Sequence, residues 1–242
     1  MKVISLVPSI TEAIFDLGLT EKEVIGRTKF CIHPEEKVRN VEIIGGTKNL
    51  NLEKIKALKP DLILSNKEEN VKDQVEVLMK DFKVSVYNTE TIEDNYYLVK
   101  NLGLLFNKEE RAQLFNLKIY EVLSLAKIGK KIKAAYLIWK NPYMTIGSDT
   151  FIHNVLSEIG FENIFKNQTR YPEIQVEDLA EADVIMLSSE PFPFKEKHIT
   201  ELKEFYPDKK IIIVDGEAFS WYGTHIAKCE DYFKKLIAEF NH

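Results

Sequence analysis

The sequence predicts an α/β fold of two Rossmann-like lobes, bridged by a single long α-helix, with a ligand cleft between the lobes. Short apolar runs alternate with helical patterns, the two halves repeat a similar order of motifs, and one long amphipathic segment separates them. Strands that alternate with helices form mostly parallel sheets covered on both faces. We expect an N-terminal lobe over residues 1–106, a linking helix over 107–129 and a C-terminal lobe over 130–242.

Six apolar runs have the length and composition of buried strands. They are Val3–Val7, Leu62–Ser65, Val84–Tyr87, Ala134–Trp139, Val184–Ser188 and Ile211–Val214. Ligands of parallel α/β sheets lie beyond the carboxyl ends of the strands. The loops that follow these runs are therefore where we expect the functional residues.

Side-chain caps predict where helices begin and end. Ser9 and Glu12 have the spacing of a capping box, and Gly18 stands where a C-terminal glycine is expected. Asn51 is expected to cap a helix that stops before Pro60.

Two further helices are predicted in the same way. Asn70 is expected to cap one, and Asp149 is expected to open another that ends at Gly160. The linking helix shows apolar residues at three- and four-residue steps, as a helix packed along one face requires. These residues are Ala112, Phe115, Ile119, Val122 and Ala126.

The two halves resemble each other internally. Leu52–Ser65 and Val176–Ser188 both open a short helix with an apolar residue and a glutamate, and both continue through an aspartate into a buried strand that ends in serine. Val3–Gly18 and Ala134–Gly160 share a strand, a polar loop and a helix closed by glycine. We interpret this pattern as two related lobes, although similar patterns also arise in unrelated α/β units.

Composition and charge exclude several classes of function. The 242 residues carry a net charge of -5 with no basic block, which disfavours a nucleic-acid partner. No apolar run approaches the roughly 20 residues of a membrane-spanning helix. The N-terminus MKVISLVPS is too short for a secretory signal, so a chain that is complete as written would be cytoplasmic. Cys31 and Cys229 are expected to be reduced.

Enzyme signatures are missing from the sequence. It has no G-x-G-x-x-G, Walker A, G-x-S-x-G or H-E-x-x-H motif. Cys31 and His33 could share a soft metal, but no second Cys/His pair follows at zinc spacing. We favour a turn with a buried thiol and a surface imidazole, and we predict no catalytic residue, no metal site and no required cofactor.

Aromatic residues gather in or near the loops of the second half. The segment FSWYG, Phe219–Gly223, follows a buried strand and is expected to be a loop that forms one wall of the cleft. Aromatic walls with a few polar groups suit a flat, bulky, partly apolar ligand. The loop aromatics are Trp139, Tyr143, Tyr171, Phe192, Phe194, Trp221 and Tyr222.

Several segments together resemble the class III substrate-binding proteins of ABC importers, and most of all the cobalamin-binding branch. The segments are VISLVPSITEAIFDLG, LEKIKALKPDLIL, the long middle helix, TFIHNVLSEIGFENIF and VEDLAEADVIML. The resemblance runs over nearly the whole chain. It implies a corrinoid, haem or ferric siderophore that is bound without chemistry, as a monomer in the periplasm or at the cell surface. The cobalamin receptor has a tryptophan where this chain has Asn66.

The resemblance also implies roles for individual residues. Stacking contacts are expected from Trp139, Tyr143, Trp221 and Tyr222, and polar contacts from Ser9, Thr11, Lys48, Asn66 and Arg170. Tyr171 and His225 are candidates for contact with the metal of a chelate. An acid on each lobe is expected to dock arginines of a membrane permease, and the candidates are Glu68, Glu69 and Glu190. The residue aligned with the family's first docking glutamate is Lys72.

Three alternatives stay open at this point. The ligand could be haem or a ferric siderophore in place of a corrinoid. The chain could be a cytoplasmic corrinoid or haem carrier that never meets a permease. It could also be a metal-dependent enzyme that uses Asp215, Glu217, His225 and Cys31 in the same cleft.

Overall fold

The computed structural model describes residues 1–241. The chain divides into two compact units. Unit 1 comprises Met1–Thr89, Glu93–Leu117 and Tyr222–His225, and unit 2 comprises Glu90–Ile92, Lys118–Trp221 and the segment from Ile226 onwards. Within residues 1–241, no helix is both long enough and apolar enough to cross a bilayer.

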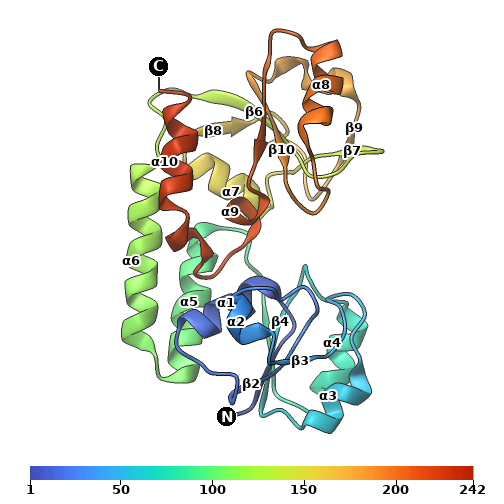
Figure 1. Cartoon of the computed structure of the whole chain (residues 1–242), viewed down its shortest axis with the longest axis vertical. Coiled ribbons are helices and arrows are strands. Elements are labelled where there is room, and N and C mark those ends of the chain that lie inside the picture. Colours follow the sequence, from blue (N-terminus) through green and yellow to red (C-terminus); the bar gives the residue numbers. More distant parts are fainter. Residues whose placement is uncertain (242) are drawn as a thin grey trace. The chain divides into compact units, whose positions relative to one another are not determined.

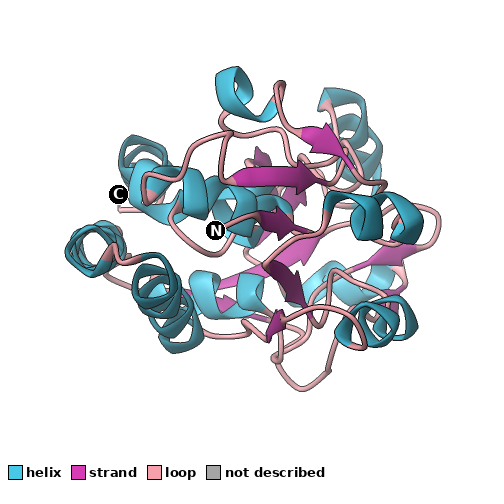
Figure 2. Cartoon of the chain, turned by 90° about the horizontal axis from the view of Figure 1, so that it is seen from below, coloured by secondary structure: helices cyan, strands magenta, loops and turns pink. Residues whose placement is uncertain are grey.

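Unit 1 is built on a five-stranded parallel sheet with the order β3-β2-β1-β4-β5. Figure 1 labels β2, β3 and β4 of this sheet. Helices flank the strands (Figure 2). The strands are β1 (Val3–Ser5), β2 (Val24–Arg27), β3 (Glu42–Ile43), β4 (Leu62–Asn66) and β5 (Val84–Tyr87). The helices are α1 (Pro8–Asp16), α2 (Glu35–Val38), α3 (Leu52–Leu58), α4 (Lys72–Met79), α5 (Ile92–Phe106) and α6 (Glu109–Leu125), of which α6 contributes to both units.

Unit 2 has a four-stranded parallel sheet with the order β11-β10-β6-β8 and a separate antiparallel pair, β7 with β9. The strands are β6 (Ile132–Leu137), β7 (Tyr143–Met144), β8 (Phe161–Asn163), β9 (Glu173–Ile174), β10 (Val184–Ser188) and β11 (Lys210–Val214). The helices are α7 (Phe151–Glu158), η1 (Val176–Glu181), α8 (Glu196–Phe205), α9 (Gly216–Ser220), η2 (His225–Lys228) and α10 (Glu230–Ala238).

The predicted strands and the internal similarity are confirmed. All six apolar runs form strands, and four strands of each sheet have the same order: β2-β1-β4-β5 in unit 1 and β8-β6-β10-β11 in unit 2. In both units a short helix, α3 or η1, directly precedes the matching strand, β4 or β10. The α/β class and the parallel sheets are therefore as the alternation predicts.

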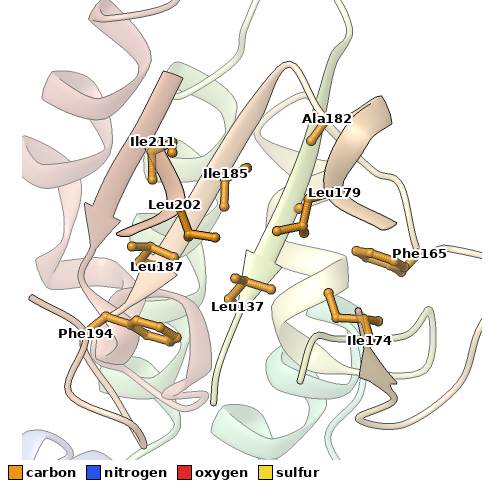
Figure 3. Packing of buried hydrophobic residues seen from close by; sticks show 11 residues of the cluster. Leu137, Phe165, Ile174, Leu179, Ala182, Ile185, Leu187, Phe194, Leu202 and Ile211 are labelled. Carbon is orange, nitrogen blue, oxygen red and sulfur yellow. The ribbon is translucent and has the colours of Figure 1, made fainter. Parts of the chain in front are cut away.

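The core of unit 2 shows how strand alternation distributes the side chains. On one face, Leu137 of β6 and Leu187 of β10 pack with Leu179 of η1 and Leu202 of α8 (Figure 3). On the other face, Tyr136 contacts Phe219 of α9, with ring centroids 5.3 Å apart. Alternate residues of a strand point to opposite faces, so both faces of this sheet must be covered.

The start of α1 differs from the prediction. Pro8 is the first helical residue and Val7 precedes it without a side-chain cap, so the capping box predicted for Ser9 and Glu12 is wrong. Proline suits the first helical position because the helix needs no amide hydrogen there. The predicted C-terminal glycine is confirmed, since Gly18 has a φ of 105°.

Of the other predicted caps, one is confirmed and two are wrong. Asn51 Oδ1 accepts a hydrogen bond of 3.0 Å from Lys54 N and caps α3. Val71 precedes α4, because the side chain of Asn70 is used in tertiary hydrogen bonds. Thr150 caps α7 through His153 N at 3.3 Å, while Asp149 accepts from Arg170 N. Tertiary partners thus decide which polar residue near a helix start becomes its cap.

Candidate functional site

A buried asparagine joins three loops at the carboxyl edge of the unit 1 sheet. Asn70 Nδ2 donates to Leu6 O and Thr47 O, both at 3.2 Å. Its Oδ1 accepts from Ser65 Oγ at 2.8 Å and from Asn66 N at 3.0 Å. These four hydrogen bonds, which we call the Asn70 network, connect the loops that follow β1, β3 and β4. Both donor hydrogens and both acceptor lone pairs of the buried side-chain amide are thus used.

The loop after β4 carries the two candidate docking acids of unit 1. Asn66 Oδ1 accepts from the backbone amides of Glu68 at 2.7 Å and Glu69 at 3.3 Å, which forms an Asx turn. Lys48 Nζ donates to Glu68 O at 2.6 Å. Asn66 is buried, so its side chain shapes this turn from within. Lys48 reaches the same turn from the loop after β3.

Ser9 and Thr11 lie in the interior of unit 1. Thr11 has no exposed surface, and its hydroxyl donates to Val7 O at 2.9 Å and lies 3.0 Å from Cys31 Sγ. Burial raises the pKa of the Cys31 thiol. Cys31 and Cys229 are both buried, and the buried thiol predicted for Cys31 is confirmed.

The segment Tyr222–His225 is fastened within unit 1 by polar contacts. Asn95 Nδ2 donates to Gly223 O at 3.1 Å, and Gly223 N donates back to the Asn95 carbonyl oxygen. His225 Nδ1 lies 2.8 Å from Glu12 Oε2. A carboxylate on one ring nitrogen fixes the orientation of an imidazole.

Around His225 the structure offers no preformed metal cage. The ring of His33 is 6.3 Å from that of His225, measured between centroids. Among residues 1–241, no group of three or more His, Cys, Asp or Glu side chains is placed to hold a metal ion.

Unit 2 presents an exposed tryptophan just beyond the carboxyl end of β6. The Trp139 residue is 40% exposed, and its ring packs edge-on against Phe192, with centroids 5.6 Å apart. Phe192, in the loop after β10, is supported in turn by Phe194 at 4.8 Å and His198 at 5.4 Å. An indole held from behind by aromatic rings offers a flat apolar surface to a ligand.

The remaining candidates of unit 2 lie on two adjoining turns. Tyr143 and Trp139 belong to one hairpin, in which Met144 N donates to Trp139 O at 3.1 Å. Burial raises the pKa of Tyr143. Arg170 has a φ of 60°, and its guanidinium lies 5.7 Å from the centroid of the Tyr171 ring. The antiparallel pairing of β7 with β9 brings this turn close to Tyr143 in the fold.

The FSWYG segment is more buried than the sequence suggests. Phe219, expected in a loop, lies in α9 and is fully buried, whereas Trp221 and Tyr222 are 8% and 6% exposed. The prediction of a loop at Phe219 is wrong, because Phe219 fills the space between Tyr136 and Phe233. Phe219 and Trp221 belong to unit 2, and Tyr222 belongs to unit 1.

Glu190 is held by the end of this same segment. Its Oε1 accepts from Ser220 Oγ at 2.7 Å and from Trp221 Nε1 at 3.1 Å. Burial raises the pKa of the Glu190 carboxyl, and the nearby acids Glu217 and Asp215 act in the same direction. The carboxylate of this candidate docking acid is therefore held in place by two hydrogen bonds, which Ser220 and Trp221 donate.

Comparisons with known proteins agree with this architecture. A family model described as periplasmic binding protein matches residues 3–203, and the chain belongs to this family. The vitamin B12-binding protein of Salmonella typhimurium is 32% identical over 180 residues, which cover 72% of this chain and 66% of the relative. An uncharacterized ABC transporter substrate-binding lipoprotein of Bacillus subtilis is 29% identical, over 72% of this chain and 58% of its own length.

Similarity to solved structures extends over the whole fold. The periplasmic haem-binding protein RhuT from Roseiflexus superposes with a TM-score of 0.82 at 16% identity, over 99% of this chain and 97% of that protein. The chain spans slightly less than two thirds of the length of the vitamin B12-binding relative, at 66%. The resemblance stated from the sequence, to class III substrate-binding proteins, is confirmed.

Sequence reasoning missed three residues that organise these loops. It treated Asn70 and Glu12 as helix caps, and it gave Phe192 no role beyond its place in a list of loop aromatics. A polar residue next to a helix pattern has the same local signature whether it caps the helix or bonds to a distant loop. Leu6, one partner of Asn70, lies 64 residues away in the sequence, and His225, the partner of Glu12, lies 213 residues away, so no local signal could identify these contacts.

Proposed function

We propose that this protein is a non-catalytic substrate-binding protein that binds a metal chelate, foremost a corrinoid, and delivers it to an ABC importer in the cell membrane. One observation carries the proposal: the chain is 32% identical over 180 residues to a vitamin B12-binding protein. The proposed place of action is the periplasm or the cell surface. No resident cofactor is proposed, because the chelate is the cargo.

The exposed face of Trp139 supports a large, flat ligand. Phe192 fixes the indole from behind, and Tyr143 stands on the other arm of the same hairpin. A corrin or porphyrin ring offers a broad apolar face with polar substituents at its edge, which matches an aromatic surface with a few polar neighbours. Arg170, next to Tyr171, would supply the positive charge for a carboxylate or phosphate at that edge.

The acids at the loop rims support the permease interaction. The turn that carries Glu68 and Glu69 is held by Asn66 and Lys48, and Glu190 is held by Ser220 and Trp221. The held carboxylate of Glu190 would lose little side-chain freedom when it meets an arginine of a partner, and the fixed backbone turn positions Glu68 and Glu69 in advance. We propose these three acids as the contacts with the permease.

The main test is a fluorescence titration with cyanocobalamin, cobinamide, haemin and a ferric siderophore, checked by calorimetry. The chain has only two tryptophans, and the structure gives them different exposures: 40% for Trp139 and 8% for Trp221. We expect saturable quenching by a corrinoid, with most of the quenched signal lost in Trp139→Phe. Trp221→Phe is the matched control and should keep the quenching. No binding of any chelate at tens of micromolar, about 6 kcal/mol, would refute the proposal.

Haem is the second candidate, and the contact between Glu12 and His225 favours it. The Glu12 carboxylate at Nδ1 would make the His225 imidazole a stronger ligand for the iron of haem. Haemin bound this way should show a shifted Soret band that disappears in His225→Ala and persists in His33→Ala. If cobinamide binds and haemin does not, this candidate is rejected.

An enzymatic role has less support from the geometry. Of the residues that such a role would use, Cys31 is fully buried and Asp215 caps α9 by accepting from Glu217 N at 3.0 Å. We expect the bound chelate to be recovered unchanged after prolonged incubation, as judged by chromatography and mass spectrometry. A converted product formed by the protein, and not by its heat-denatured sample, would reverse this conclusion.

A further inference from the structure

Helices α5 and α6 of unit 1 expose an apolar surface that the proposed function does not use. Tyr97 and Leu104 of α5 are 66% and 52% exposed, and Leu114 and Leu117 of α6 are 66% and 52% exposed. Soluble proteins seldom gather large apolar side chains on one exposed face, and such faces mark interaction sites. These four residues define what we call the α5–α6 face.

A groove runs along this face where the two helices meet. The helices lie side by side (Figure 1), and they approach closely because a Cβ atom on Gly103 would lie only 2.5 Å from that of Ala112. The groove has a volume of about 430 Å³, and Leu104, Ala112 and Leu117 provide its apolar walls. Lys100 of α5 and Glu109 of α6 line the same groove.

The groove wall also contains an unsatisfied polar atom. Asn116 Nδ2 donates to Tyr96 O at 3.0 Å, while Asn116 Oδ1 is buried and has no hydrogen-bond partner among the described residues. Buried acceptors without a donor are uncommon in folded proteins.

We infer that the α5–α6 face is an interface between two copies of this chain, which pack hairpin against hairpin around a two-fold axis. A two-fold interface joins the same patch on both copies, so each residue meets a different residue of that same patch. Charged residues in such a patch avoid facing their own charge only when both signs are present, and Lys100 and Glu109 on its two walls provide both. Each lysine would face the glutamate of the other copy, with the leucines between them.

The charge of the region favours a second copy over an anionic membrane. Residues 92–125 contain five acids (Glu93, Asp94, Glu109, Glu110, Glu121) and four bases (Lys100, Lys108, Arg111, Lys118). Surfaces that bind anionic membranes carry an excess of lysine and arginine around the apolar face. Because this region is nearly neutral, two copies that meet there repel each other little, although each whole chain carries a net charge of -5. The inference departs from the monomer expected from the sequence.

Sedimentation velocity over about 1 to about 100 µM protein tests the interface. We expect a concentration-dependent dimer, and at least about a tenfold weaker association in the double variant Leu104→Glu, Leu117→Glu. Met79→Glu is the matched control, because Met79 is 46% exposed on α4, away from the groove, and it should leave the association unchanged. Far-UV circular dichroism and thermal melts establish that each variant is folded.

Charge reversal separates this interface from general stickiness. Lys100→Glu and Glu109→Lys should each weaken the dimer, and the two changes combined in one chain should restore it. A protein that stays monomeric at all concentrations overturns the inference, as does a dimer that the double leucine variant leaves intact. Flotation of the protein with vesicles of phosphatidylcholine and phosphatidylglycerol, lost in the leucine variant without any dimer, would assign the face to a membrane instead. None of these outcomes depends on chelate binding.

Discussion

Replacement of Asn70 tests whether one buried amide holds the carboxyl-edge loops of unit 1 together. Asn70→Ala removes four hydrogen bonds, of 3.2, 3.2, 2.8 and 3.0 Å, from a residue that is 6% exposed. At about 1 kcal/mol for each bond, the loss in the free energy of unfolding is about 4 kcal/mol. That is a large part of the roughly 5–15 kcal/mol that stabilises a typical domain.

Asn70→Asp is the informative comparison because it changes the shape of the side chain very little. An aspartate can still accept from Ser65 Oγ and Asn66 N, but it cannot donate to Leu6 O and Thr47 O. Its second oxygen would then face two carbonyl oxygens, so we expect Asp to cost at least as much as Ala at neutral pH. Asn51→Ala, which removes one helix cap, serves as the control and should cost about 1 kcal/mol.

Urea denaturation measures these differences, and hydrogen exchange localises them. A loss of about 4 kcal/mol corresponds to a decrease in Tm of roughly 8–16 °C for a chain of this size. In the Asn70 variants, the amides of Glu68 and Glu69 should exchange faster, since their turn is anchored through Asn66. The reasoning fails if Asn70→Ala costs less than about 1 kcal/mol or if Asn70→Asp is as stable as the wild type.

Three further changes test the packing of unit 2. Phe219→Ala should cost about 3–5 kcal/mol by urea denaturation, because Phe219 is fully buried against Tyr136; a cost typical of a loop residue would contradict its place in the core. Gly216→Ala should destabilise unit 2, because the new Cβ would overlap Glu190 Cγ; an unchanged melting temperature would argue against that contact. Glu190→Gln keeps an acceptor for Ser220 and Trp221 and removes a buried charge. Burial raises the pKa of Glu190 in the folded state, so its ionisation lowers stability as pH rises from the usual glutamate pKa through the raised value. The variant should lack that decrease, and parallel pH profiles of melting temperature would refute the assignment.

The sequence by itself determined the class of fold and its repeated plan. Buried strands such as Val184–Ser188 and Leu62–Asn66 are recognisable because a parallel sheet covered on both faces needs continuous apolar runs, which are a local property of the chain. Gly18 and Gly160 were identifiable for a similar reason, since a positive φ at the end of a helix selects glycine at that position. Family membership followed from several such local segments taken together.

Only the tertiary structure decided how individual polar and aromatic residues are used. Asn70 and Glu12 look like helix caps in the sequence, yet Asn70 also bonds to Leu6, 64 residues away, and Glu12 contacts His225, 213 residues away. Phe219 and Trp139 both follow strands, but the first is fully buried and the second is 40% exposed. Burial depends on what the other elements place around a side chain, and that information is spread over the whole sequence. For this reason the sequence identifies the aromatic candidates as a group, but only the structure shows that Trp139 is exposed.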